Sequence, residues 1–165
     1  MGNENDVKAN IEKMLQDHQL VEAYHSIREA VETAPWKKEL IFLYAFVSIC
    51  NGYDKDAVAA LNNEAVFGLN EDFILAKAHL LLKEKRIQEA EEHLNRLIDA
   101  HKNYYLILKG IAAKLFCLDL FPLGRAYISC VLKNSDISNS SKSHLRRKFS
   151  FYLVGTATED DTIPF

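Results

Sequence analysis

Residues 39–65, ELIFLYAFVSICNGYDKDAVAALNNEA, decide the fold that this sequence predicts. The first part, to Cys50, is apolar on most sides, which is typical of a helix in the centre of a protein. Asn51 and Gly52 end that helix, and Asp54 is a suitable N-cap for the next one. The second helix is amphipathic, with Ala57, Leu61 and Ala65 on its inner stripe. The stretch therefore predicts a helical hairpin.

The same two-helix pattern occurs four times along the chain. Each second helix carries a small residue, and a branched aliphatic residue follows it four positions later. The small residues are Ala23, Ala57, Ala90 and Gly124, and the aliphatic residues are Ile27, Leu61, Leu94 and Ile128. Successive small residues are 34, 33 and 34 positions apart. Because a small side chain lets helices pack closely, this period predicts an array of helical hairpins.

The pattern resembles the tetratricopeptide repeat family over about residues 4–135, with degenerate repeats. The matching positions are Ala23, Ile27, Ala30 and Pro35 in repeat one, Tyr44, Ala45, Gly52 and Ala57 in repeat two, Ala78, Ile87, Ala90 and Leu94 in repeat three, and Ala112, Phe121, Gly124 and Ile128 in repeat four. The sequence departs from the family at the first-helix Trp position, which is occupied by Val7, Ile41, Ile74 and Leu108. The resemblance implies an all-α fold, a right-handed superhelical solenoid of four hairpins with a C-terminal capping helix.

This organisation predicts one domain over residues 1–155. Its repeats are expected at about 4–37, 38–70, 71–104 and 105–138, and its capping helix at about 141–154. Residues 156–165 are acidic and have no periodicity, which predicts a flexible tail.

The resemblance also implies that the first helices line a concave groove. The groove positions carried over from the family that would bind a partner are Phe42, Phe46, Ile49, Leu75, His79, Leu82, Lys109 and Phe116. Most of these side chains are apolar, and leaving such a cluster in water is costly. We therefore expect that an apolar peptide or amphipathic helix of a partner protein covers the groove. The alternative is self-coverage, by tight superhelical closure, by the tail or by a second copy of the chain.

These features predict a non-enzymatic adaptor or chaperone that binds another protein and needs no cofactor. Small tetratricopeptide proteins of this length are similar to bacterial secretion chaperones, which suggests protein secretion as one setting. The alternative function is a structural, homo-oligomeric repeat module. The sequence has no Gly-rich phosphate loop, no GxSxG and no HExxH motif, so we expect no catalysis.

Composition restricts the partners and the location. The formal charge is −3 and no basic stripe stands out along the sequence, so we expect no nucleic-acid partner. The polar N-terminus and the absence of a long apolar run predict a cytoplasmic protein that does not insert into a membrane. Cys50, Cys117 and Cys130 are expected to be free thiols in a reducing compartment.

Two further clusters have both a functional and a structural interpretation. His93 and His101 are eight positions apart, whereas metal-binding histidines on one helix prefer spacings of three or four, so no metal site is predicted. The basic run Lys142, His144, Arg146, Arg147 and Lys148 precedes Phe149, Phe151 and Tyr152. It could contact RNA or a membrane, but we favour a capping helix with one solvated basic face.

Overall fold

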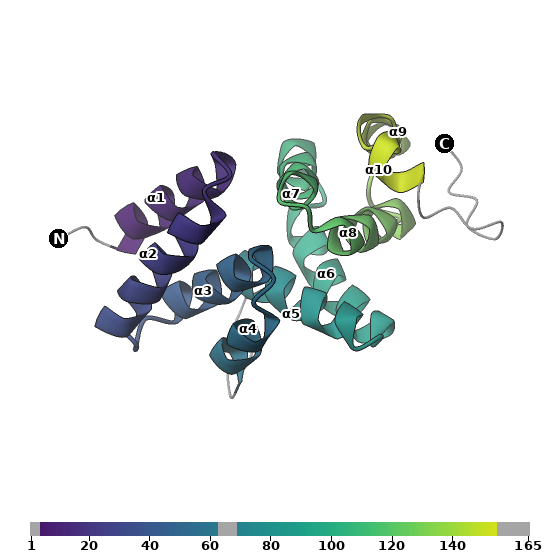
Figure 1. The fold of residues 1–165 in the computed structure, drawn as a ribbon. Coiled ribbons are helices and arrows are strands. Elements are labelled where there is room, and N and C mark those ends of the chain that lie inside the picture. The colour runs from purple at the N-terminus through teal and green to yellow at the C-terminus, as the bar shows by residue number, and fades with distance from the viewer. Residues whose placement is uncertain (1–3, 63–68, 155–165) are drawn as a thin grey trace. The chain divides into compact units, whose positions relative to one another are not determined.

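The computed structural model describes residues 4–62 and 69–154, and these residues form ten helices and no strand (Figure 1). The helices are α1 (Glu4–Gln16), α2 (Leu20–Thr33), α3 (Lys38–Cys50), α4 (Asp54–Leu61), α5 (Glu71–Lys83), α6 (Ile87–His101), α7 (Tyr105–Cys117), α8 (Phe121–Lys133), α9 (Asn139–Lys148) and α10 (Ser150–Val154). The all-α prediction is confirmed for this part of the chain. The predicted tail at 156–165 and the last position of the second-repeat stripe, Ala65, lie outside the described residues.

The period of the sequence is present in the backbone of the turns. The first helix of each hairpin is followed by a residue in the left-handed region, at intervals of 34, 33 and 34 positions. These residues are His18 (φ 57°), Gly52 (φ 75°), Lys85 (φ 61°) and Asp119 (φ 61°). At each turn, the next N–H donates to the carbonyl five positions earlier, for example Tyr53 to Ser48 at 2.8 Å and Leu120 to Leu115 at 2.9 Å. This bond is part of the Schellman motif, so the same C-terminal cap ends all four first helices.

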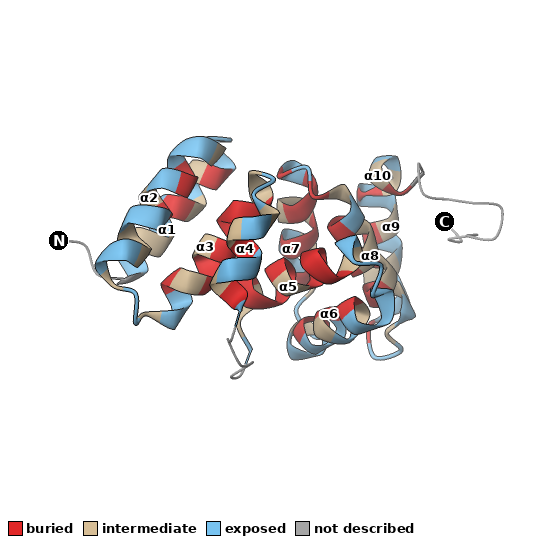
Figure 2. Cartoon of the chain, turned by 60° about the horizontal axis from the view of Figure 1, so that its bottom comes forward, coloured by how far each residue is buried: buried red, intermediate tan, exposed pale blue. Residues whose placement is uncertain are grey.

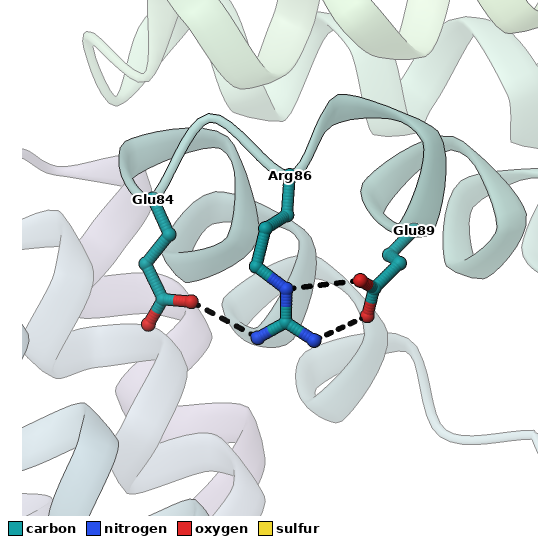
Figure 3. A network of polar contacts seen from close by, with 3 residues as sticks. All are labelled: Glu84, Arg86 and Glu89. Carbon is teal, nitrogen blue, oxygen red and sulfur yellow. Dashed lines mark hydrogen bonds and ion pairs between the residues drawn. The ribbon is translucent and has the colours of Figure 1, made fainter.

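The turn between α5 and α6 also carries an exposed polar network. Arg86 follows the left-handed Lys85, and its guanidinium bridges two carboxylates (Figure 3). Its Nη1 donates to Glu84 at 3.0 Å, and its Nε donates to Glu89 at 2.9 Å. These hydrogen bonds raise the pKa of Arg86 and lower that of Glu89. Because all three side chains are exposed, the network fixes the local conformation of the turn more than it adds to stability.

The stripe predicted on the second helices is buried. Ala23, Ala57, Ala90 and Gly124 are all buried, as are the aliphatic residues Ile27, Leu61, Leu94 and Ile128. At Gly124 the reason for a small residue is direct, because an added Cβ would lie 2.7 Å from Cε1 of Phe116. The periodic small residues are therefore interior positions, as the sequence predicted.

The contacts divide the chain into two compact units, Met1–His93 (unit 1) and Leu94–Phe165 (unit 2), and the division falls within α6. A single domain over 1–155 and a right-handed solenoid stay predictions.

The core of unit 1 is built around α3. This helix packs against α1, α2, α4 and α5, and most of its residues are buried (Figure 2). Its buried hydroxyl, on Ser48, donates to the carbonyl of Tyr44 at 2.7 Å, so the polar atom is satisfied within the helix. The prediction that this apolar helix is central is confirmed within unit 1.

Unit 2 contains the hairpin of α7 and α8, followed by α9 and α10, which both pack against α8. The predicted capping helix is thus two helices, and Phe149 forms the C-cap of the first. Phe149 is buried and its ring lies 5.3 Å from that of Phe116, while Tyr152 stacks on Phe116 at 4.6 Å. These two short helices therefore cover the apolar side chain at the end of α7.

Candidate functional site

The predicted groove residues of α3 are in the core of unit 1. Phe46 has no exposed surface, Ile49 is 2% exposed and Phe42 is 7% exposed. The ring of Phe42 meets that of Phe73 edge-on, with 5.1 Å between centroids. Leu75 on α5 is also fully buried, and Leu82 is half-buried. The open apolar face expected from the sequence is therefore absent from this part of unit 1.

Neighbouring helices explain this difference. The ring of Phe42 contacts Phe73 of α5, and α1, α2, α4 and α5 all pack against α3, so other helices of unit 1 bury these side chains. Lys8 Nζ on α1 lies 3.9 Å from the buried carboxylate of Asp72 on α5, and this ion pair joins the two flanking helices. Of the alternatives drawn from the sequence, coverage by the chain itself agrees with this arrangement. Whether these residues bind a partner stays a prediction.

His79, also predicted for the groove, is 9% exposed and pairs with the first residue of α4. Its Nε2 lies 3.2 Å from Asp54 Oδ1, and Lys83 Nζ lies 3.0 Å from Asp54 Oδ2. Burial lowers the pKa of His79 below its ordinary value despite the nearby carboxylate. Partial burial acts to raise the pKa of Asp54, but Lys83 and His79 outweigh it and lower that pKa. The cluster joins α4 to α5.

The two predicted groove residues in unit 2, Phe116 and Lys109, differ in their exposure. Phe116 is 2% exposed, beneath Phe149 and Tyr152. Lys109 is half-buried, and its Nζ lies 5.9 Å from the centre of the Tyr105 ring, a cation–π distance. Only Lys109 of the pair is therefore accessible to a partner.

Unit 1 has a shallow groove between α2 and α4, with α3 as its floor. Its volume is about 420 Å³. The lining residues are Arg28, Val31, Glu32, Pro35, Ile41, Tyr44, Asp56, Ala59, Ala60 and Asn62. Half of these side chains are apolar, and the polar half consists of the Arg28–Glu32 ion pair, Tyr44, Asp56 and Asn62. This combination suits an apolar segment with a few polar groups.

Hydrogen bonds among Tyr24, Tyr44 and Asp56 hold the polar part of this groove. The Tyr24 hydroxyl donates to Asp56 Oδ2 at 2.7 Å and lies 3.4 Å from the Tyr44 hydroxyl. Hydrogen bonding to Tyr44 and Asp56, together with burial, raises the pKa of Tyr24 above its ordinary value. The network connects α2, α3 and α4, so it keeps the walls and the floor of the groove in register.

A second groove, also of about 420 Å³, lies between α1, α2 and the start of α3. Its lining includes Val7, Ile11 and Met14 from α1, and Ala30 from α2. Lys37 and Leu40 line its α3 end, and the remaining lining residues are Asn10, Ser26, Glu29, Thr33 and Ala34. The two grooves therefore use different sides of α2.

Trp36 is located in the connection between α2 and α3 and is 72% exposed. It is the only tryptophan of the chain. The residue before it, Pro35, lines the first groove, and the residue after it, Lys37, lines the second. Tryptophan is enriched among the residues that dominate protein interfaces. We define Trp36 and these two grooves as the Trp36 surface.

Sequence reasoning missed the Trp36 surface because it weighed residues by their place in the repeat. Trp36 belongs to no stripe, since it follows the Pro35 that ends a repeat. The available signal was a single large aromatic residue placed next to a proline in a connection, where no core position is expected.

Comparisons of the chain with protein-family models, with curated proteins and with solved structures gave no match. Within residues 4–62 and 69–154, no group of three metal-ligating side chains is gathered, and no helix has the length and hydropathy needed to cross a membrane.

Proposed function

We propose that the protein is a non-catalytic helical-repeat protein, related in kind to tetratricopeptide proteins, that binds an apolar segment of a partner protein. The binding site we propose is the Trp36 surface. Two observations support the class of protein: the period of 33–34 in the sequence and the four repeated left-handed turns. The exposure of Trp36 between two grooves is the observation that carries the binding site.

The energetics favour a partner at this position. An aromatic side chain buries roughly 150–250 Å² when fully covered. With 72% of Trp36 exposed, its coverage would contribute on the order of 3 kcal/mol at about 25 cal/mol per Å². The grooves on either side accept smaller apolar side chains, as expected around an interface anchor. An amphipathic helix or an extended apolar peptide would cover Trp36 and would also place apolar side chains in the two grooves.

Affinity purification of the full chain, with identification of the retained proteins, would supply the partner. The purified partner is then titrated against wild type, Trp36→Ala and Val21→Ala. Val21 is a suitable control because it is also an exposed apolar residue, 51% exposed on α2. We expect Trp36→Ala to weaken binding at least tenfold and Val21→Ala to leave it within about twofold.

Two outcomes would contradict the proposal. A partner that binds Trp36→Ala as tightly as wild type does not use this surface. A shift of wild-type Trp36 emission with protein concentration alone, together with a dimer in light scattering, would show that a second copy of the chain occupies it.

A further inference from the structure

The charges of the chain are divided unequally between the two units. Residues 1–93 carry ten Lys and Arg against seventeen Asp and Glu, a net charge of −7. Residues 94–154 carry ten Lys and Arg against three Asp, a net charge of +7, and Glu159, Asp160 and Asp161 bring the whole of unit 2 to +4. The total of −3 therefore conceals a strongly basic segment. The expectation of no nucleic-acid partner rested on that total and on the lack of a basic stripe in the sequence.

Two of the three acidic residues in this segment have partners in unit 2. Asp136 accepts from Lys102 Nζ at 3.0 Å, and Asp99 accepts from Asn134 at 2.8 Å. From Ile137 to Val154 the sequence has no acidic residue. The positive charge of α9 is therefore not balanced by neighbours in sequence.

The exposed face of α9 is polar and basic. Ser140, Ser143, His144 and Arg147 are exposed and are three or four positions apart, which places them on one side of the helix. Lys148 is exposed beside them, and none of these side chains pairs with a carboxylate in the part of the chain that the structure describes. Hydroxyl and cationic side chains in this arrangement are the usual partners of phosphate oxygens.

Two other elements of unit 2 carry exposed aromatic side chains. Phe151 on α10 is 85% exposed, and Tyr104 at the N-cap of α7 is 60% exposed. The ring of Tyr105 lies 5.9 Å from that of His144, and Lys109 lies over Tyr105, so this one ring brings a basic side chain of α7 close to α9. Exposed aromatic rings next to positive charge are the features on which unpaired bases stack.

We propose that this surface, made of Ser140, Ser143, His144, Arg147, Lys148 and Phe151 with Lys109 and Tyr104, binds single-stranded nucleic acid. Phosphates would contact the α9 face and bases would stack on the two exposed rings. A membrane surface fits less well, because every exposed residue of α9 is polar or charged, which leaves Phe151 on α10 as the one wholly apolar side chain of this surface. This inference is independent of the protein-binding role of the Trp36 surface.

The test titrates the full chain against a fluorescein-labelled 20-nucleotide oligouridine, read by anisotropy. Wild type should bind at 50 mM salt, and four phosphate contacts would weaken binding about fifty-fold at 200 mM. Arg147→Glu/Lys148→Glu should weaken binding at least tenfold, and Phe151→Ala about fivefold or more. The control variant Lys13→Glu/Lys55→Glu makes the same change in net charge as Arg147→Glu/Lys148→Glu, at two exposed sites of unit 1. Its affinity for the oligonucleotide should stay within about twofold of wild type.

Reversing two charges in the last turn of α9 could disturb the helix, so Arg147→Gln/Lys148→Gln is measured in parallel, with circular dichroism on all variants. The glutamine pair should keep the helical spectrum and still lose several-fold in binding. The proposal is overturned if wild type does not bind the oligonucleotide, or if the Lys13/Lys55 control loses as much affinity. It is also overturned if 3:1 phosphatidylcholine–phosphatidylserine vesicles or polyglutamate bind this surface and the oligonucleotide does not.

Discussion

The imidazole of His79 lies 3.2 Å from the carboxylate of Asp54, and this contact links the start of α4 to the middle of α5. Because burial lowers the folded-state pKa of His79, the unfolded chain binds its proton more tightly. The contribution of this group to stability is therefore complete above the unfolded pKa of about 6.5 and is lost as pH falls below it. Asp54, whose pKa is also lowered, loses its contribution only below about pH 4.

We expect unfolding free energy to fall between pH 7 and pH 5, with His79 adding at most about 1.4 kcal/mol per pH unit. In His79→Gln the decrease in unfolding free energy per pH unit should be smaller, because the titrating imidazole is absent. Urea denaturation of both proteins across this range measures the difference. Equal slopes would show that His79 titrates alike in the folded and unfolded states.

Gly124→Ala tests the close packing of α7 and α8. The new methyl would lie 2.7 Å from the Phe116 ring, and Phe116 is itself held by Phe149 and Tyr152. We expect a loss of about 1–3 kcal/mol in unfolding free energy. Gly110→Ala, on the exposed side of α7 with nothing within 4 Å, is the matched control and should be neutral or stabilising. Equal effects at the two glycines would contradict the packing described here.

The repeated left-handed turn predicts opposite effects at two positions. Gly52→Ala places a Cβ at φ 75° and should cost about 1–2 kcal/mol, although the space around Gly52 is open. Asp119→Gly relieves a similar strain at φ 61° and should be neutral or stabilising. Thermal unfolding of both variants gives the comparison, and a stable Gly52→Ala protein would argue against the turn.

Phe46 and Trp36 distinguish the groove predicted from the sequence from the surface found in the structure. Phe46→Ala removes a fully buried ring and should cost about 3–5 kcal/mol, whereas Trp36→Ala should change stability by about 0.5 kcal/mol or less. Urea denaturation measures both. If Phe46→Ala remains as stable as wild type and loses only partner binding, the original groove prediction is correct.

The sequence predicted the hairpins well because their signals are local. The small residues, their aliphatic neighbours and the Asn-Gly turn report helix faces and helix ends, and the four repeated caps agree with that period. The break at Phe149 was missed, since residues 141–154 lack a glycine or proline that would signal it.

The candidate site was less predictable because it depends on which helices cover which faces. An apolar face such as that of Phe42 and Phe46 has the same sequence pattern whether a partner or other helices of the chain cover it. Trp36 was hard to predict for another reason. The repeat pattern describes positions within helices and gives no role to a residue in the connection between two of them. The basic run of α9 is visible in the sequence, but the charge difference between the two units depends on where the structure divides the chain.

The most direct test of the central claim uses Trp36 itself, because its fluorescence is the only tryptophan signal of the chain. In the free protein we expect emission typical of a water-exposed indole and strong quenching by acrylamide. On addition of the purified partner, the emission should shift to shorter wavelength and the quenching should fall several-fold. Unchanged emission and quenching in a fully formed complex would show that the partner binds elsewhere.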